Sequence, residues 1–383
     1  MPESLVTDLQ AIGERAGLAA MGIAGPDEFS ETRKNLVDRK AAGLHGGMQF
    51  TYRNPDRSTD PHRILPGARA LVVGAWGYRR ADPEGRAGPD HRDDPEDRND
   101  PGGRGTAGSR RGELHGSERP VGRVARYSWQ DHYASLRAAL GQLADRLRAD
   151  GWAARVVCDD NALVDRAAAH RAGLGWYGKN SLLLLNGLGS WYVLGTVVTD
   201  APLPPSVEVP GEHGQGCGSC TRCMSACPTG AIVAPGVVDA RRCLAWLVQA
   251  PGSFPMAWRS ALGDRIYGCD ECQQVCPINR LADRRFPPGP ADDGAEPAVD
   301  LLAMLAASDD DLLERHGRWY IAQRDPRFLR RNALVALGNT GDGDAPGVDA
   351  ALRRALADPD SMIREHASWA AEQLGRSDLT GAA

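Results

Sequence analysis

Apolar residues in the first half of the chain follow two patterns, one with helical spacing and one of short runs rich in β-branched residues. The expected helices span residues 4–16, 133–149 and 162–172. The expected strands span residues 18–23, 70–75, 152–157, 181–185 and 191–198. Asn-Gly-Leu-Gly at 186–189 predicts a hairpin-type turn between the last two strands. These elements predict an α+β or α/β domain over residues 1–205, and we expect α+β.

The last part of the chain, residues 291–383, has helical spacing and a weak internal repeat. Residues 325–333 superpose on residues 358–367, and Gly338 and Gly375 are expected to end the two helices. Paired helices of this kind are typical of a short helical solenoid. Two units are too few for a free-standing array, so we expect them to pack on the rest of the protein.

Residues 81–119 follow neither pattern. Leu114 is the one large apolar residue in this stretch, and acidic residues and arginines alternate without a period. Such a segment buries too little apolar surface to offset the entropy lost on ordering. We therefore expect a disordered surface insertion.

Eight of the nine cysteines form a repeated pattern. Residues 217–228 read Cys-x₂-Cys-x₂-Cys-x₃-Cys-Pro, and Cys243 followed by residues 269–277 supplies a second set. This spacing is typical of two [4Fe–4S] clusters in which the fourth cysteine of each run ligates the other cluster. The expected ligands of cluster one are Cys217, Cys220, Cys223 and Cys276. The expected ligands of cluster two are Cys227, Cys243, Cys269 and Cys272.

Zinc and disulfides are the alternative uses of these cysteines. Zinc sites usually carry Cys₄ or Cys/His pairs without this run, and disulfides need an oxidising compartment. The N-terminus, Met1-Pro-Glu-Ser-Leu, lacks the order of an export signal, so we expect a cytoplasmic protein. Cys158 stands apart in an apolar run, which is more typical of a small buried side chain than of a nucleophile.

Composition narrows the class of protein only slightly. Hydrophobic residues make up 42% and charged residues 25%, as in ordinary globular proteins. The net charge of -5 argues against bulk attraction to nucleic acid, although a local basic face is compatible with it. No apolar run approaches the ~18 residues that span a bilayer. A glycine-rich phosphate loop after a strand is also missing, which disfavours a dinucleotide-binding domain.

Several longer stretches resemble the epoxyqueuosine reductase family, a family of cobalamin-dependent iron–sulfur enzymes of tRNA modification. The matching stretches are GLHGGM at 43–48, RNPDRSTDPHRILPGA at 53–68, GRVARYSW at 122–129, DRAAAHRAGLGWYGKNSLLL at 165–184, GSWYVLGTVVTD at 189–200 and the cysteine runs. The resemblance covers nearly the whole chain apart from 81–119. It implies reduction of epoxyqueuosine to queuosine at the wobble position of tRNA.

The same resemblance implies three domains. Residues 1–205 would form a nitroreductase-like, cobalamin-binding core, and residues 206–290 a ferredoxin-like module with two [4Fe–4S] clusters. Residues 291–383 would form HEAT-like helical repeats that contact the tRNA anticodon stem-loop. Electrons would pass from an unidentified low-potential donor through the clusters to cobalamin, in a protein expected to be monomeric.

Asp159 matches the proton donor of that family. An aspartate at the end of an apolar strand can face a cofactor cavity, where burial would raise its pKa. The alternative is an ordinary helix N-cap, a role open also to Asp160 and Asn161. The chain departs from the family here, because members commonly carry a small residue after the aspartate and this chain carries a second acid. That departure leaves the substrate preference open.

Further cofactor contacts are implied by the resemblance. Lys179 and Asn180, at the end of a glycine-rich stretch, would bind corrin amides or phosphate. Arg57, Leu183 and Leu194 match family contacts with cobalamin. On local sequence alone, the lysine would lie in a tight turn, Arg57 on the surface and the two leucines in the core.

A basic segment, residues 315–331, is the expected RNA contact. Six arginines and one aspartate are interleaved with aromatic residues, a pattern that suits phosphates and unpaired bases. Arg331 is the family match, and Arg318 and Arg330 are further candidates. The alternative is a solenoid surface with core aromatics. Two other functions stay open: an electron-transfer protein without corrin, and a related reductase acting on a small molecule.

Overall fold

The computed structural model describes residues 2–81, 119–206 and 215–381. The expected insertion at 81–119 lies outside the described residues except for its two ends. The described chain forms two compact units that interleave along the sequence. Unit 1 comprises 1–79, 130–243 and 270–288, and unit 2 comprises 80–129, 244–269 and 289–383. The expected division into three consecutive domains stays a prediction.

Unit 1 contains the elements expected from the first half of the chain and both short helices of the cysteine runs. Its α-helices are α1 (Pro2–Arg15), α2 (Ser30–Ala41), α3 (Pro55–Ser58), α5 (His132–Ala149), α6 (Asp165–Arg171), α7 (Arg222–Ser225), α10 (Glu271–Gln274) and α11 (Pro277–Arg285). Its strands are β1 (Ala20–Ala24), β2 (Ala70–Gly77), β4 (Ala154–Val157), β5 (Gly175–Tyr177), β6 (Leu183–Leu185), β7 (Tyr192–Thr199), β8 (Ile232–Ala234) and β9 (Val237–Val238). The mixed helix and strand content confirms that part of the expected fold class.

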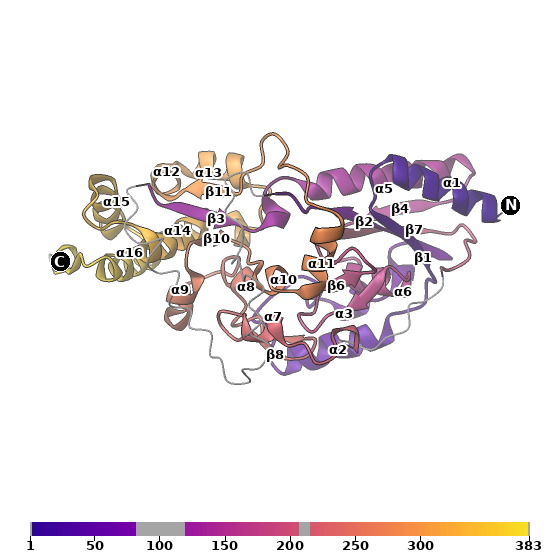
Figure 1. The fold of residues 1–383 in the computed structure, drawn as a ribbon, viewed down its shortest axis with the longest axis horizontal. Coiled ribbons are helices and arrows are strands. Elements are labelled where there is room, and N and C mark those ends of the chain that lie inside the picture. The colour runs from indigo at the N-terminus through magenta and orange to yellow at the C-terminus, as the bar shows by residue number, and fades with distance from the viewer. Residues whose placement is uncertain (1, 82–118, 207–214, 382–383) are drawn as a thin grey trace. The chain divides into compact units, whose positions relative to one another are not determined.

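The centre of unit 1 is a four-stranded antiparallel sheet with the order β1-β2-β7-β4 (Figure 1). Successive residues of a strand face opposite sides, and β7 shows this directly. Leu194 and Val198 belong to the core shared with α6, whereas a side chain at Gly195 would meet Leu140 of α5. The sheet therefore lies between α5 and α6, and α1 packs on α5.

The expected pairing of the strands on either side of residues 186–189 is wrong. The turn forms, but β6 pairs with β5, while β7 joins the central sheet between β2 and β4. A Cβ at Gly175 would lie 2.1 Å from the Leu184 carbonyl oxygen, so the missing side chain permits the close β5–β6 contact. Neighbouring strands in sequence pair only about two times in three, and here the preference fails.

Unit 2 combines a small sheet with a helical assembly. Strand β3 (Val121–Val124) lies between β10 (Arg265–Tyr267), parallel to it, and β11 (Ala298–Asp300), antiparallel to it. Its α-helices are α8 (Leu244–Leu247), α9 (Met256–Leu262), α12 (Leu301–Ala306), α13 (Asp309–His316), α14 (Arg327–Thr340), α15 (Pro346–Leu356) and α16 (Ser361–Gln373). The core is built around the almost fully buried α14, which contacts α12, α16 and β10.

The two repeated segments do form helices, α14 and α16, but only one of the two expected terminal glycines ends a helix. Gly375 follows α16 with φ +73° and confirms the prediction. Gly338 lies inside α14, because Trp369 of α16 packs against it and a Cβ there would approach the indole to 2.8 Å. This glycine therefore serves close helix–helix packing. No helix in the described ranges has the length and apolar character needed to cross a bilayer.

Candidate functional site

The topology of the central sheet brings several titratable side chains to one edge. Both β2 and β4 are antiparallel to β7, so their carboxyl ends lie together beside the first residues of β7. Tyr78 directly follows β2, and Asp159 follows β4. Helix α5 begins at the same edge with Tyr133 in its first turn, since the charge of Asp159 acts on that phenol and raises its pKa beyond the effect of burial. The edge therefore carries an acid and two phenols.

Asp159 has the properties expected of a proton donor. Partial removal from solvent raises the pKa of its carboxyl to about 6, with Arg137 opposing this effect and Asp160 and Asp131 reinforcing it. The side chain keeps access to solvent and makes no hydrogen bond with the described part of the chain. The N-cap of α6 is Val164, so the alternative role of Asp159 as a helix cap is wrong.

Asp165 contacts the backbone of the loop that carries Asp159. Asp159 has φ +54°, a conformation that costs a non-glycine residue about 1 kcal/mol or more. Its backbone N–H donates to the carboxyl of Asp165, the first residue of α6. Burial raises the pKa of that carboxyl well above its usual range, and the charges of Asp159 and Asp160 raise it further. A neutral Asp165 still accepts this hydrogen bond through its carbonyl oxygen.

The residues that depart from the family pattern anchor the same loop. The side chain of Asp160 accepts the N–H of Ala162. The amide oxygen of Asn161 accepts the backbone N–H of Thr51 at 2.9 Å, and the Asn161 carbonyl accepts the Ser58 hydroxyl at 3.0 Å. Asp160 and Asn161 therefore fix the loop to its own turn and to the 51–58 segment, which gives the departure a structural role.

Replacing Asp165 tests this positioning role. We expect Asp165→Ala to lower the single-turnover rate of the reaction implied by the family resemblance about 10- to 100-fold, because the loop loses the acceptor that holds Asp159 in place. Asp165→Asn should retain most of the rate, since its amide oxygen is nearly isosteric with the carbonyl of the neutral acid. Equal rates in the two variants, at equal thermal stability, would contradict the role.

Tyr78 links this edge to the second cysteine run. Its hydroxyl receives a hydrogen bond from the Gln273 amide at 3.0 Å, and the same amide donates to the Ser190 carbonyl at 3.0 Å. Burial raises the pKa of Tyr78, and the charges of Asp270 and Cys272 contribute in the same direction. The thiol of Cys272 is thus close enough to the phenol to influence its ionisation. One of the cysteines predicted to ligate cluster two therefore lies on the side of Asp159.

The expected ligands of cluster one come together in unit 1. The pKa of Cys223 is raised to about 11, mainly by burial and in addition by the charges of Cys217, Cys276 and Cys220. Burial likewise raises the pKa of Cys276, with Cys217 and Cys220 adding to it. Four half-buried thiols that oppose one another's ionisation are stable as thiolates only beside a compensating positive charge. This donor set fits an iron–sulfur cluster.

The cysteines expected at cluster two are divided between the units. Cys227, Cys243 and Cys272 belong to unit 1 and Cys269 to unit 2, so their joint ligation stays a prediction. The sulfur of Cys227 accepts the backbone N–H of Ala231 at 3.2 Å. In the described ranges, no group of three or more His, Cys, Asp or Glu side chains has the arrangement of a single-ion metal site. Cys158 is buried with a pKa raised by burial to about 12, which confirms its expected role as an inert core residue.

The residues implied as corrin contacts differ in how far their side chains are already engaged within the protein. Arg57 is exposed and its guanidinium makes no hydrogen bond or ion pair with the described part of the chain. Lys179 donates to the Gly218 carbonyl at 2.7 Å, and the buried Asn180 donates to the Cys272 carbonyl at 3.4 Å. These two residues thus contact both cysteine runs. Leu183 and Leu194 lie in the core below the sheet, as their local sequence suggests.

Arg331 is not placed to bind RNA, contrary to the sequence prediction. Its side chain is fully buried in unit 2, where the guanidinium donates to the carbonyls of residues 247, 248, 250 and 252 and to the Asn332 side chain. Burial lowers its pKa to about 9, with Arg259 contributing, so the charge persists near neutral pH. The Arg-Asn pair holds the 247–252 loop against α14.

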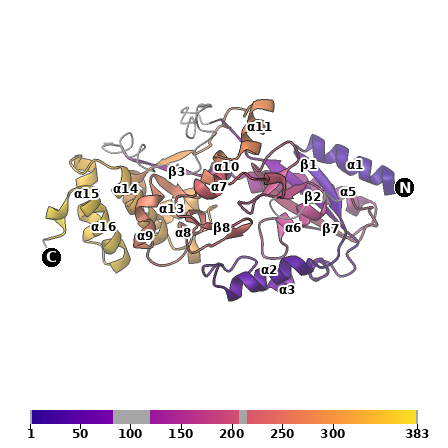
Figure 2. The same ribbon diagram turned by 60° about the horizontal axis from the view of Figure 1, so that its bottom comes forward.

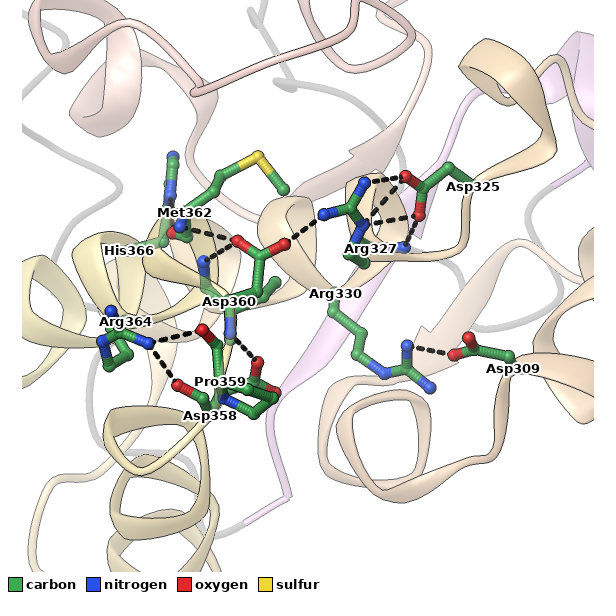
Figure 3. Close-up of polar contacts among 11 residues, drawn as sticks. Asp309, Asp325, Arg327, Arg330, Asp358, Pro359, Asp360, Met362, Arg364 and His366 are labelled. Carbon is green, nitrogen blue, oxygen red and sulfur yellow. Dashed lines mark hydrogen bonds and ion pairs between the residues drawn. The ribbon is translucent and has the colours of Figure 1, made fainter.

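The other charges of residues 315–331 are largely engaged within unit 2. Arg327 bridges Asp325 and Asp360, and Arg330 pairs with Asp309 (Figure 3). Arg315 pairs with Glu296 at 2.7 Å, and the exposed Arg318 donates to the Trp129 carbonyl. Trp319 and Phe328 are buried core residues, whereas Tyr320 is 52% exposed. RNA contact by Arg318 and Arg330 stays a prediction.

Stability measurements distinguish a structural from a nucleic-acid role of Arg331. We expect Arg331→Met to lower the free energy of unfolding by about 3–5 kcal/mol, because buried carbonyls lose their donor. Arg330→Met should cost less, about 1–2 kcal/mol, since it removes a pair with the exposed Asp309 and one hydrogen bond to the Ala307 carbonyl. Denaturant titration followed by circular dichroism checks both. An Arg331→Met protein of normal stability with selectively lost tRNA affinity would contradict the structural role.

Three residues of the site could not be identified from the sequence alone. Tyr78 lies three residues after the expected strand 70–75, Tyr133 is the first residue of the expected helix 133–149, and Asp165 lies three residues into the expected helix 162–172. Their positions relative to those elements are visible in the sequence. Their convergence is not, because it requires the strand order of the central sheet.

Comparison with known proteins gives consistent results. Residues 216–279 match the 4Fe-4S double cluster binding domain family. The epoxyqueuosine reductase of Xanthomonas campestris is 33% identical over 98% of this chain and 97% of its own length. A crystal structure of epoxyqueuosine reductase with an epoxyqueuosine-modified tRNA-Tyr stem loop has 28% identity and a TM-score of 0.80, covering 98% of this chain and 91% of that one. The Bacillus subtilis epoxyqueuosine reductase, with its catalytic loop swung out of the active site, has 27% identity and a TM-score of 0.81, covering 100% and 94%.

Proposed function

This chain belongs to the epoxyqueuosine reductase family, and on that basis we propose that it reduces epoxyqueuosine in tRNA to queuosine. The observation that carries the proposal is the full-length similarity to these reductases, combined with an unbonded acid of raised pKa at the sheet edge. The substrate is the anticodon stem-loop of tRNA. The protein acts in the cytoplasm as a monomer, with a low-potential carrier as electron donor.

Asp159 supplies a proton to the epoxide oxygen. Loss of that oxygen as water consumes two electrons and two protons and leaves a carbon–carbon double bond. A carboxylic acid with a pKa of about 6 is roughly one-tenth protonated at pH 7, about a hundred times more than an ordinary aspartate, and remains a strong enough acid to assist the departing oxygen. Asp165 fixes the backbone of the donor, and Arg137 limits how far its pKa rises. Solvent access to Asp159 allows the proton to be replaced between turnovers.

Electrons reach the substrate through groups that the chain binds. Two [4Fe–4S] clusters and a corrin supply the low-potential electrons that side chains lack. We propose Cys217, Cys220, Cys223 and Cys276 as ligands of cluster one, and Cys227, Cys243, Cys269 and Cys272 as ligands of cluster two. Tyr78 and Gln273 connect the Cys272 segment with the edge where Asp159 lies.

The corrin is proposed to lie at that same edge. The chain fits such a group in two respects: the Arg57 guanidinium has no partner in the described ranges, and Tyr133 and Asp159 bring polar groups to the edge. Lys179 and Asn180 support the cysteine runs that face it. The antiparallel sheet between α5 and α6 is proposed to be a nitroreductase-like core, and α14–α16 to be HEAT-like repeats.

A direct assay tests the reaction. Protein reconstituted anaerobically with iron, sulfide and cobalamin is incubated with a chemical reductant and epoxyqueuosine-containing tRNA. Mass spectrometry of the wobble nucleoside should show loss of one oxygen atom. Absence of that change, in a sample whose absorption spectrum shows retained corrin and clusters, would overturn the proposal and favour a small-molecule substrate. Failure to retain corrin would favour a two-cluster electron carrier.

A further inference from the structure

Helix α11 presents apolar and basic side chains to solvent. Leu281 is 63% exposed on this helix, and Phe286, which follows it, is 50% exposed. Arg284 and Arg285 are also exposed, and the Arg285 guanidinium lies 5.4 Å from the centroid of the Phe286 ring. Two large exposed apolar groups beside positive charge are typical of a protein–protein contact. In Figure 2, α11 is the orange helix at the top of the view.

The positive charge of this surface is not neutralised by its own helix. Asp283 is the single acid of α11, and its carboxylate pairs with Arg79 at 2.8 Å. Arg79 also donates to the Phe286 carbonyl, which fixes the end of the helix. The neighbouring cysteine run, residues 215–228, contains no acid and carries the exposed Arg222. Helix α11 and residues 215–228 together thus carry more arginines than acids, in a protein whose net charge is -5.

The same helix starts at a ligand of cluster one. Cys276 is the N-cap of α11 and lies among the thiols of Cys217, Cys220 and Cys223. Among the proposed ligands of cluster two, in contrast, Cys272 directly precedes Gln273, whose side-chain amide donates to the Tyr78 hydroxyl at 3.0 Å on the side of the proposed proton donor. Cluster one is therefore the outer cluster and cluster two the inner one. An electron donor would approach from the α11 side.

We propose that the α11 surface, formed by the exposed Leu281, Arg284, Arg285 and Phe286 together with the half-buried Arg280, docks a small acidic one-electron carrier protein. This inference rests on the proposed function, because it assumes that electrons pass through both clusters. Each reduced carrier is oxidised by one electron and cluster one is reduced by one electron. Two encounters supply one turnover. Opposite charge accelerates the encounter, and a small apolar contact permits rapid release.

Charge reversal on α11 tests the docking surface. Reduced flavodoxin, an acidic carrier, is mixed anaerobically with the reconstituted protein, and bleaching of the clusters is followed by stopped flow. Arg280→Glu/Arg285→Glu should lower the second-order rate about tenfold or more at low salt. The wild-type rate should fall as salt is added, whereas that of the variant should change little. Arg354→Glu, an exposed arginine on α15, serves as the matched control and should react like wild type.

Chemical reduction separates this inference from the proposed function. Dithionite should reduce the double variant and support turnover on tRNA at wild-type rates, since it needs no docking surface. An unchanged flavodoxin rate in the variant, or a wild-type rate independent of salt, would overturn the docking surface alone. Equal slowing with both reductants would also overturn it, by showing damage to cluster one. If the wild-type protein did not turn over tRNA with dithionite, that result would instead contradict the proposed function.

Discussion

Asp159→Asn should lower the rate of epoxyqueuosine reduction by about 10²–10⁴-fold, the usual contribution of a positioned general acid. The amide cannot donate an acidic proton, yet it has nearly the same size as the carboxyl. Because the Asp159 side chain makes no hydrogen bond with the described residues, the substitution breaks no structural contact. Single-turnover analysis of the wobble nucleoside measures the loss, and unchanged cluster and corrin spectra show that the cofactors remain bound. A rate within threefold of wild type would exclude Asp159 as the donor.

The pH dependence of the reaction provides a second test of the same residue. The donor acts in its protonated form, so kcat/KM should fall as the pH rises through the pKa of Asp159, which is about 6 in the free protein. Asp160→Asn removes a neighbouring negative charge and should move this alkaline limb to lower pH. Arg137→Met removes a positive charge and should move it to higher pH. Shifts in the opposite directions, or none, would contradict the assignment.

Cys276→Ala should abolish turnover and remove one cluster. Iron content should fall to about half, because each cluster holds the same number of iron atoms. The structure places the Cys276 thiol among those of the first run, so the cluster that is lost should be the one lost in Cys223→Ala. Electron paramagnetic resonance of the reduced proteins compares the remaining signals. Cys158→Ala should retain both clusters.

The alternative assignment keeps each run to its own cluster. In that case Cys276→Ala would resemble Cys272→Ala in its residual signal and would differ from Cys223→Ala. Comparison of the three spectra therefore decides the pairing without a high-resolution structure of the loaded protein.

Local elements were predictable from the sequence because their signals are local. The apolar spacing of residues 133–149 gives α5, and the β-branched run at 70–75 gives most of β2. The pairing of the strands could not be predicted in this way, because it depends on contacts between residues that are distant in sequence. The β5–β6 pair forms where Gly175 allows backbone approach, and β7 consequently pairs with β2 and β4.

The residues of the candidate site were likewise predictable only in part. The cysteine spacing predicts a ligand set whose cluster-one members come together in the structure. Asp159 came from family resemblance, and its isolation from local hydrogen bonds removes the helix-cap alternative. The family match of Arg331 predicted an RNA contact, but this arginine is buried and holds a loop instead. Charge counted along a segment does not reveal which side chains point inward.

The position of Cys276 has a consequence for biogenesis. Its thiol meets those of Cys217, Cys220 and Cys223 only after the intervening chain has folded back on itself. On the proposed ligand assignment, neither run alone would supply all four sulfurs of one cluster, so a chain released before Cys276 would hold an incomplete ligand set. Cluster assembly would then depend on completion of the fold, and truncated or misfolded chains would lack the cofactor that makes the protein redox-active.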